Sequence, residues 1–416
     1  MSQNHLGIGF IGGGFITRFH IQSLISVRNV DVMGVMSKTK TSAEESAAIA
    51  RNIGVGDNAS AYDSITEMIA DPNIHALWVC SPNFVRIETF EEIANAISSA
   101  KGELIGVTCE KPLGRNVAEA QKVVELTKSV GLLDGYLENQ VFSPSITRGK
   151  EIIWARGAAT TGRPYLARAA EEHSGPHMPW FWEGALQGGG VLNDMMCHSV
   201  EEARFMLTAP GKPRDSIKPI SISAHTDCLK WQRPEYIKIL SDNSNGETDY
   251  SKKPSEDFAR SLIEYLDEDG NKLIVETTTS WCFVGEGLRL SMELFGPEYS
   301  MFVNTLDPDL KVFFSRKVTG NEGEDLVEKQ NAESGGMPVV SSEAEVYGYT
   351  AENRHMVESF LNGKRPDENF DDGLDVTRLL MAAYMRAEKE KTIKLPNNDI
   401  ETFIPAVARG EWNPKG

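Results

Sequence analysis

Two side chains four residues apart, Asp194 and His198, place a carboxylate and an imidazole in the segment 188–198 (GGGVLNDMMCH). At this spacing they lie on one face of a helix, where the carboxylate can orient the imidazole or share its proton. Histidine is the usual general base near neutral pH, so the pair indicates proton transfer from a hydroxyl group. The preceding glycines would let a substrate approach the backbone. Taken alone, the segment fits a capped helix with an ordinary half-buried histidine equally well.

A lysine that suits the same chemistry, Lys111, lies in the segment 109–112 (CEKP) after an expected strand. An ammonium group there can hold a substrate hydroxyl and stabilise the negative charge that develops on its oxygen. Pro112 would fix the direction of the lysine, and a cis peptide bond is one way to do this. A solvated lysine in a turn is the alternative for this segment.

A glycine-rich loop, residues 12–17 (GGGFIT), follows the apolar run at the N-terminus. Gly12 would permit the tight turn, and Gly14 would let the backbone approach a pyrophosphate at the start of the helix, beside Phe15 and Ile16. Thr17 departs from the usual Gly or Ala at the third small position, which brings close packing of strand and helix into question. Strand, glycines, helix and second strand come in the required order, so a dinucleotide site is favoured over a plain turn.

The residues after the second and third expected strands bear on the choice of cofactor. An acid after the second strand would bind the ribose 2′-hydroxyl, but this chain has Ser37, Lys38 and Lys40 there. The lysines could meet a 2′-phosphate or lie solvated in a loop, so the sequence permits NADP and leaves NAD open. Ser81 and Asn83 begin a turn after the third strand, at the edge where such sheets bind ligands. Asn83 is thus a candidate for the nicotinamide end, although a strand-ending turn is the commoner meaning.

The segment 173–182 (HSGPHMPWFW) combines histidines with aromatic rings. Glycine and proline between the two histidines disfavour a helix, and no third ligand follows at a standard spacing, so we expect no metal. Aromatic rings with polar neighbours suit stacking on a sugar, which makes His173, His177, Trp180 and Trp182 candidates for a substrate pocket. Ordinary core packing of the two tryptophans is the alternative.

Strands alternate with helices in the first third of the chain, as in βαβ units of a parallel sheet. The expected strands are 6–11, 30–36, 75–80, 104–109 and 132–137, and the expected helices are 20–26, 42–51, 87–100 and 117–130. Right-handed crossovers then give an α/β domain with a doubly wound, Rossmann-type sheet. We expect this domain to cover residues 1–142.

Longer β-rich runs begin after about residue 145 and predict a large mixed or antiparallel sheet with helices on one face. The expected elements are a helix at 145–156, strands at 165–171, 219–224, 259–265, 272–283, 288–295 and 311–315, and closing helices at 352–362 and 374–389. Two polar stretches, 229–258 and 319–337, are interpreted as insertions or flexible excursions. We expect a second α/β domain over residues 143–416, whose closing helices could pack back on the first.

The composition is that of an acidic globular protein. Its 416 residues carry a net charge of −18, which disfavours nucleic acid, anionic membranes and anionic substrates as partners. Five cysteines without CxxC spacing indicate reduced thiols. The N-terminus lacks the features of a signal peptide, and no apolar run reaches the roughly 18 residues that span a bilayer. We therefore expect a cytoplasmic protein.

Together, these motifs make the sequence similar to the Gfo/Idh/MocA family, which includes glucose–fructose oxidoreductase and inositol dehydrogenase. The matching stretches are GFIGGGFITRFH, VCSPN, CEKPLGRN, GYLENQVFSP, GGGVLNDMMCH, YGYTAENRHMVESFLNGKRP and DDGLDVTRLLMAAYMRAE. They cover nearly the whole chain in the family's order, and the combination of EKP with GGG and D-x3-H is specific, while any single piece is not. The resemblance implies an N-terminal Rossmann domain and a C-terminal α/β domain whose open sheet often forms the oligomer interface. A homodimer or homotetramer is therefore expected.

The resemblance also implies an activity, an NAD(P)-dependent oxidoreductase acting on a sugar, polyol or sugar derivative, with NAD the cofactor by family habit. Lys111 matches the family's lysine that contacts the substrate hydroxyl and the nicotinamide ribose. Asp194 and His198 match its Asp/His pair, with His198 as the acid/base. The chain departs from the family in 229–258 and in 173–182, where substrate identity would be decided, so the resemblance does not give the substrate.

Three further positions follow from the same resemblance. Glu110 and Asn83 would lie near the nicotinamide, and Asn139 lies in the matching Glu-Asn segment. Two alternative functions stay open. Some relatives use tightly held NAD to oxidise a sugar transiently, eliminate the aglycone, add water and reduce again, which would make the chain a glycoside hydrolase. The other is a non-catalytic nucleotide-binding sensor, against which the intact lysine and Asp/His pair argue.

Overall fold

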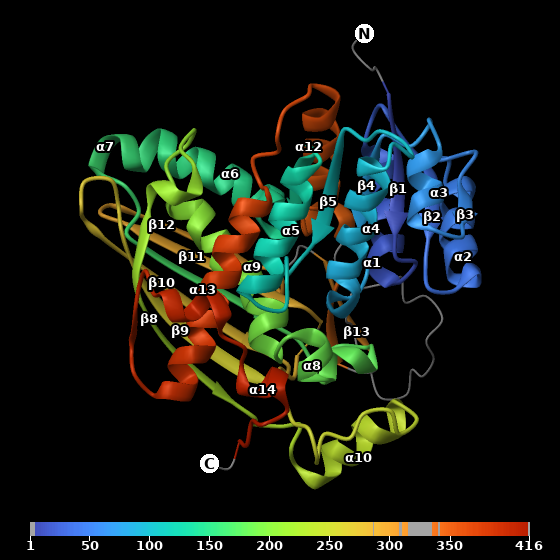
Figure 1. Ribbon diagram of the computed structural model, residues 1–416. Helices are drawn as coiled ribbons and strands as arrows, with labels where there is room; N and C mark the ends of the chain where they lie inside the picture. Colours follow the sequence, from blue (N-terminus) through green and yellow to red (C-terminus); the bar gives the residue numbers. More distant parts are fainter. Residues whose placement is uncertain (1–4, 286, 308–309, 315–334, 340–341, 415–416) are drawn as a thin grey trace. The chain divides into compact units, whose positions relative to one another are not determined.

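The computed structural model describes residues 5–285, 287–307, 310–314, 335–339 and 342–414 (Figure 1). The chain divides into two compact units. The first comprises Met1–Pro144 and Tyr347–Thr377, and the second comprises Ser145–Val346 and Arg378–Gly416. Each unit is thus built from two segments that are far apart in the sequence.

A six-stranded parallel sheet with the order β3-β2-β1-β4-β5-β6 forms the centre of the first unit (Figure 1). Its strands are β1 Leu6–Ile11, β2 Val30–Met36, β3 Ser60–Tyr62, β4 Ala76–Val79, β5 Gly106–Glu110 and β6 Leu133–Leu137. The predicted Rossmann-type sheet is confirmed. The strand order reverses between β1 and β4, and ligands of such sheets bind beyond the carboxyl ends of the strands at this switch point.

Side-chain caps begin three of the helices in the first unit. The helices are α1 Phe15–Ser23, α2 Lys40–Asn52, α3 Ile65–Ala70, α4 Arg86–Ser98, α5 Val117–Ser129, α12 Tyr349–Leu361 and the start of α13 Phe370–Lys389. Thr39, Ser64 and Asn116 each accept a hydrogen bond from a backbone amide in the first turn of α2, α3 and α5. Helix α1 differs, because its N-cap is Gly14 and no side chain caps it.

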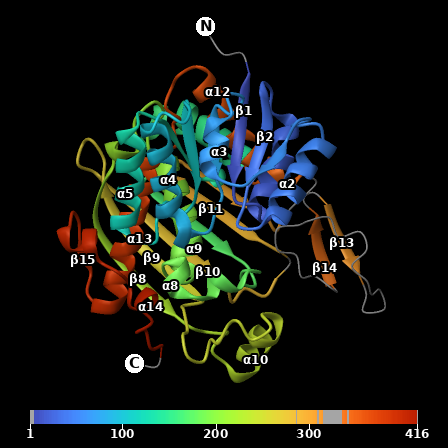
Figure 2. The ribbon, with the colours of Figure 1, turned by 45° about the vertical axis from the view of Figure 1, so that its right-hand side comes forward.

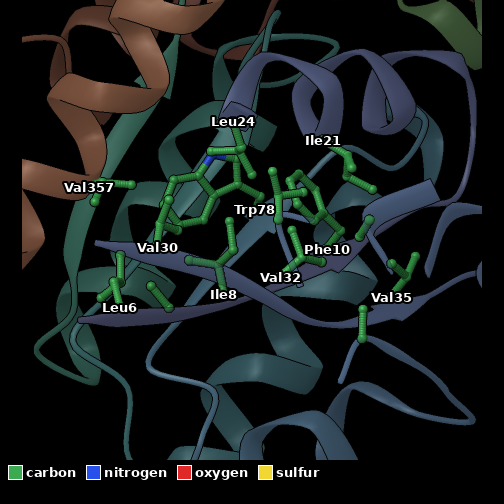
Figure 3. Packing of buried hydrophobic residues seen from close by; sticks show 14 of the residues in the cluster. Leu6, Ile8, Phe10, Ile21, Leu24, Val30, Val32, Val35, Trp78 and Val357 are labelled. Atoms are coloured by element: carbon green, nitrogen blue, oxygen red, sulfur yellow. The ribbon is translucent and has the colours of Figure 1, made fainter. Parts of the chain in front are cut away.

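The core of the first unit joins β1, β2 and β4 to a helix from the far end of the chain (Figure 3). Phe10 and Trp78 lie side by side in this core, and the rings of Trp78 and Phe360 meet edge to face at 5.9 Å. Trp78 also donates from Nε1 to Oδ1 of Asn353 at 2.9 Å. Burying an aromatic side chain of this size contributes about 2–3 kcal/mol, so α12 is an integral part of this unit.

The second unit is built on a seven-stranded sheet with the order β12-β11-β7-β10-β9-β8-β15 (Figure 2). Its strands are β7 Leu166–Glu172, β8 Lys218–Asp227, β9 Phe258–Leu266, β10 Lys272–Ser280, β11 Arg289–Gly296, β12 Tyr299–Asn304 and β15 Ile393–Lys394. Among the described residues of this sheet, β7 and β10 pair in parallel and all other neighbouring strands pair antiparallel. The predicted mixed sheet is therefore confirmed. Helix α9 (Val191–Leu207) packs against β7, β9 and β10.

The other helices of the second unit are shorter. They are α6 Pro144–Ile152, which continues as a π-helical segment at Ile153–Ala158, α7 Ala159–Thr161, α8 Gly184–Gln187, α10 Pro234–Asn243, α11 Glu343–Val346 and α14 Ala406–Arg409. Helix α13 ends in this unit. The predicted helix at 145–156 corresponds to α6 and the π-helical segment.

The polar stretch 229–258, interpreted from the sequence as an insertion or flexible excursion, contains regular structure. It contains α10, and its ends are tied together because Asp257 accepts hydrogen bonds from the three backbone amides of residues 229–231 at 2.7–3.0 Å. Tyr250 is fully buried and donates to the carbonyl of Ser255. The hydrogen bonds to the buried carboxylate of Asp257 hold this stretch together, and the sequence shows no apolar pattern that would have indicated this structure.

The second polar stretch, 319–337, lies outside the described residues up to residue 334. Its end belongs to β14 (Gly335–Val339), which pairs antiparallel with β13 (Leu310–Phe314). None of the helices in the described part of the chain combines the length and the apolar character that crossing a bilayer requires.

Candidate active site

The turn after β1 has the geometry of a dinucleotide-binding loop. Gly12 has φ +110°, and a Cβ there would lie 2.7 Å from the carbonyl oxygen of Cys80, so only glycine fits. Thr17 is fully buried and donates from Oγ1 to the carbonyl of Gly12 at 2.9 Å. Threonine at the third small position therefore fastens the helix to the turn instead of weakening their packing.

The space beside Gly14 suits an anionic group. Apart from Gly14 and its two neighbours in the chain, no atom of the described residues lies within 4 Å of a Cβ built at Gly14, and no acidic residue lies in the first turn of α1. The amides at the start of this nine-residue helix therefore present the positive end of the helix dipole. Phe15 is 44% exposed and Ile16 is half-buried at the same helix start. These observations fit the pyrophosphate of a dinucleotide.

At the end of β2, one of the two lysines considered from the sequence is the better candidate for binding a 2′-phosphate. Lys40 forms an ion pair with Asp63 at 2.8 Å. Lys38 is exposed and forms no ion pair with any residue that the structure describes, and Ser37 beside it is half-buried. Lys38 is thus the better candidate for a 2′-phosphate.

Polar groups gather after β4 and β5. Ser81 and Asn83 are buried, and Oγ of Ser81 has no hydrogen-bond partner among the described residues. A buried hydroxyl left in this way fits a site that a ligand completes. Arg86, also buried, donates to the carbonyls of Ser81 (3.2 Å) and Pro112 and so ties the two loops together. No local pattern marked this arginine, which lies at the start of the amphipathic helix α4.

Lys111 lies at the carboxyl end of β5, and the peptide bond between Lys111 and Pro112 is cis, as considered from the sequence. The side chain of Lys111 is half-buried. Its backbone amide donates to Oε2 of Glu110 at 3.1 Å. The lysine therefore stands at the same sheet edge as the glycine loop, one strand beyond β4.

Glu110 has a partner that sequence reasoning missed, His20 of α1. Oε1 of Glu110 lies 2.8 Å from Nε2 of His20, and both residues are buried. Asn353 fixes the tautomer: its Oδ1 accepts from Trp78, so its Nδ2 faces Nδ1 of His20 at 2.9 Å. The imidazole therefore carries its proton on Nε2 and donates it to the Glu110 carboxylate.

Two further polar residues of this unit, Asn139 and Glu352, lie in surroundings that indicate a role in the fold. Asn139 donates from Nδ2 to the carbonyl of Tyr347 at 2.7 Å and so holds the chain before α12. Glu352 is fully buried, and neither of its carboxyl oxygens has a hydrogen-bond partner among the described residues. Burial, followed by the nearby Glu110 and Glu138, holds the pKa of Glu352 well above its usual range. Burial in the core therefore favours the neutral form of Glu352.

Asp194 and His198 lie on α9, as predicted, and both are buried in the second unit. Oδ2 of Asp194 accepts from Nε1 of Trp281 at 3.3 Å. Nε2 of His198 lies 3.9 Å from Oε2 of Glu171 on β7. The sequence identified the Asp/His pair by its spacing, but Trp281 and Glu171 come from distant strands and left no local signal.

The segment 173–182 forms no regular helix apart from a 3-10 turn at Pro179–Trp182. His173 is fully buried, and its Nδ1 accepts from the backbone amide of Gly175 at 2.9 Å. Trp182 is buried among Trp231, Tyr250 and Trp281. The surroundings of Trp182 fit ordinary core packing, the alternative to a place in a substrate pocket. Two other candidates lie nearer the surface: His177 is exposed, and the half-buried Trp180 stacks on Phe181 at 3.8 Å.

The N-terminal part of the chain is similar to a known family of proteins. Residues 6–134 match the GFO_IDH_MocA model, described as an oxidoreductase family with an NAD-binding Rossmann fold. The chain is 30% identical over 201 residues to 1,5-anhydro-D-fructose reductase of Ensifer adhaerens, covering 48% of this chain and 56% of that protein. It is 28% identical over 202 residues to myo-inositol 2-dehydrogenase of Thermotoga maritima, covering 48% and 54%. The chain thus spans about half the length of these relatives.

Solved structures share the fold over almost the whole chain. GenD2 from gentamicin A biosynthesis, in complex with NAD, has a TM-score of 0.74 at 23% identity and covers 95% of this chain and 98% of its own. Levoglucosan dehydrogenase in complex with NADH has a TM-score of 0.66 at 20% identity, covering 94% and 100%. Residues 6–134 thus match the Gfo/Idh/MocA family of oxidoreductases, whose model describes an NAD-binding Rossmann fold.

Proposed function

We propose that the protein is an NAD(P)-dependent dehydrogenase that acts on a secondary alcohol of a sugar, polyol or sugar derivative. One observation carries the proposal: the open helix start at Gly14, the orphaned hydroxyl of Ser81 and the side chain of Lys111 all follow strands that end at one edge of the parallel sheet. Pyrophosphate, nicotinamide end and substrate hydroxyl would bind along this edge. The relatives named as sugar and polyol dehydrogenases support the substrate class.

The chain's own residues would divide the chemistry as follows. A bound nicotinamide would supply the acceptor for the hydride that leaves the carbinol carbon. The Lys111 ammonium binds the carbinol oxygen and stabilises the charge that develops on it. His198 takes the hydroxyl proton, so that the alcohol becomes a ketone, and Asp194 orients the imidazole. The exposed His177 and the half-buried Trp180 are the candidates for contacts to sugar hydroxyls and ring faces.

A panel of sugars and glycosides tests the function. The protein is incubated with myo-inositol, levoglucosan, glucose and nitrophenyl glycosides, with NAD or NADP, and reduced nicotinamide and free nitrophenol are measured together. We expect one NAD(P)H per product with at least one compound. In Lys111→Ala and His198→Ala, turnover should fall by at least about 10²-fold while cofactor affinity is retained. Nitrophenol release without net NADH would identify the redox glycosidase instead. Nucleotide binding without any turnover would favour the sensor.

We also propose that copies of the chain associate through the face of the seven-stranded sheet that α9 does not cover. This face carries exposed apolar side chains, among them Leu262 (38% exposed) and Phe302 (66%). Replacing Leu262 by Lys should lower the molar mass measured by light scattering from that of a dimer or tetramer. A monomeric unmodified protein would contradict this assembly.

A further inference from the structure

The start of helix α9 lacks a cap of its own. Its N-cap residue is Gly190, so no side chain at that position can accept hydrogen bonds from the first-turn amides. The first bond within the helix is Asp194 N to Gly190 O at 3.1 Å. Four amides, those of residues 190–193, therefore need acceptors from elsewhere in the fold.

Two residues from distant segments accept from all four amides. The carboxyl Oε1 of Glu256 accepts from the amides of Gly190 (2.9 Å) and Leu192 (3.2 Å), and its backbone carbonyl accepts from Val191 (3.0 Å). The phenol oxygen of Tyr384 accepts from Gly190 (3.0 Å) and Asn193 (3.2 Å). Tyr384 donates its own proton to Oε1 of Glu256 at 2.5 Å, so the two acceptors form one unit.

The glycines of the loop make room for this external cap. A Cβ at Gly189 would lie 2.0 Å from the phenol oxygen of Tyr384, and a Cβ at Gly190 would lie 2.4 Å from the carbonyl oxygen of Glu256. Gly188 has φ +97°, which also favours glycine. The sequence suggested that these glycines admit a substrate, but the space next to Gly189 and Gly190 is filled by the cap.

We propose that Glu256 and Tyr384 are positioning residues for the acid/base pair, and this rests on the proposed dehydrogenase function. Asp194 and His198 follow Gly190 by about one and two helical turns, so the cap that holds the first turn also sets where both side chains stand. A shift of the acid/base group by about 1 Å lowers the rate of the chemical step by up to about 10²-fold. The cap belongs to α13 and the segment before β9, and neither residue touches the substrate in this proposal.

Three variants and a control test the proposal. Tyr384→Phe removes the phenol that bonds residues 190 and 193, and Glu256→Ala removes the carboxylate. Glu256→Gln keeps the acceptor oxygen. Tyr250→Phe is the matched control, because it removes one fully buried phenol of the same unit whose proton goes to the carbonyl of Ser255.

Amide hydrogen exchange of the peptide covering residues 188–200 gives a readout that needs no substrate. We expect exchange at the start of α9 to rise about tenfold in Tyr384→Phe and further in Glu256→Ala, and to stay unchanged in Tyr250→Phe. With the best compound of the panel, kcat should fall by about tenfold in Tyr384→Phe and by more in Glu256→Ala. KM for the cofactor should stay within about twofold in both variants. Glu256→Gln should recover most of the kcat lost in Glu256→Ala.

The outcomes separate this proposal from the proposed function. If Tyr384→Phe behaves like Tyr250→Phe in both exchange and kcat, the positioning role is refuted while the dehydrogenase stands. Faster exchange with unchanged kcat also overturns it, because the cap would then be structural only. If no compound is turned over by the unmodified protein, the dehydrogenase function fails, and the exchange data still decide whether the cap exists.

Discussion

The imidazole of His20 donates to the carboxylate of Glu110 at 2.8 Å, and both side chains are buried inside the first unit. The bond links the first helix to the strand that ends at Lys111. Glu110 also accepts from the backbone amide of Lys111, so its two oxygens hold a helix and a loop at once. This pair therefore supports the lysine that the proposed reaction depends on.

Replacing His20 by Leu should lower the free energy of unfolding by about 2–3 kcal/mol, because a buried carboxylate then loses the donor of a charge-assisted hydrogen bond. His5→Leu is the matched control, since His5 binds Asp31 at the same 2.8 Å with about half of each side chain exposed. That change should cost about 0.5 kcal/mol or less. Urea unfolding of both variants measures the difference, and equal losses would show that the buried pair adds nothing special.

The cofactor preference should respond to residues at the end of β2. Ser37→Asp should raise the preference for NAD over NADP by about tenfold, because a carboxylate there accepts from the ribose 2′-hydroxyl and repels a 2′-phosphate. Lys38→Ala should weaken NADP binding, whereas Lys40→Ala should leave it nearly unchanged, since Lys40 is paired with Asp63. Titration with each nucleotide measures the ratios. Three unchanged ratios would mean that the end of β2 does not face the ribose.

Local patterns predicted the parts of the fold that local residues determine. The strand expected at 6–11 is β1, Leu6–Ile11, because a run buried on both faces of a parallel sheet is continuously apolar. The Asp194 and His198 pair was recognised because four residues make one helical turn. Short elements such as β3 (Ser60–Tyr62) gave no usable pattern, since three residues do not establish a period.

Contacts between distant segments left no such pattern. Glu256 and Tyr384 lie 66 and 194 residues from Gly190 in the sequence, so no residue near the triple glycine indicated that they cap α9. Trp182 was expected in a pocket or in the core, and only its three aromatic neighbours place it in the core. Spacing rules reach about two helical turns along the chain, and beyond that tertiary packing decides what a side chain does.

The indole of Trp281 should matter for turnover through Asp194. Trp281→Phe keeps most of the ring packing but removes the N–H that bonds Oδ2 of Asp194 at 3.3 Å. We expect kcat to fall about tenfold with cofactor affinity unchanged, because the carboxylate then loses a fixed donor. Trp154→Phe is the control: its Nε1 donates to the carbonyl of Met206 at 3.0 Å, away from Asp194. Equal kcat values in the two variants would separate Trp281 from the reaction.

The stability of the protein should depend on pH through Glu256. Burial raises the pKa of this carboxyl from 4.5 to about 7, although its hydrogen bonds from Tyr384 and the α9 amides work in the opposite direction. The folded state therefore binds more protons than the unfolded state between pH 4.5 and 7. Glu256 thus lowers the free energy of unfolding as pH rises through this window, by about 3 kcal/mol in total, and adds no further change above it.

Glu256→Gln removes this titration and keeps the acceptor oxygen. The free energy of unfolding of the variant minus that of the unmodified protein should therefore rise by about 3 kcal/mol between pH 4.5 and pH 8. Glu264→Gln should change in the opposite direction and by less, because the hydrogen bond from Ser221 and the nearby Lys272 lower the pKa of this half-buried carboxyl. Urea unfolding across the pH range measures both differences. A flat difference for Glu256→Gln would mean that its carboxyl titrates alike in the folded and unfolded states, and that burial at the start of α9 does not set its charge.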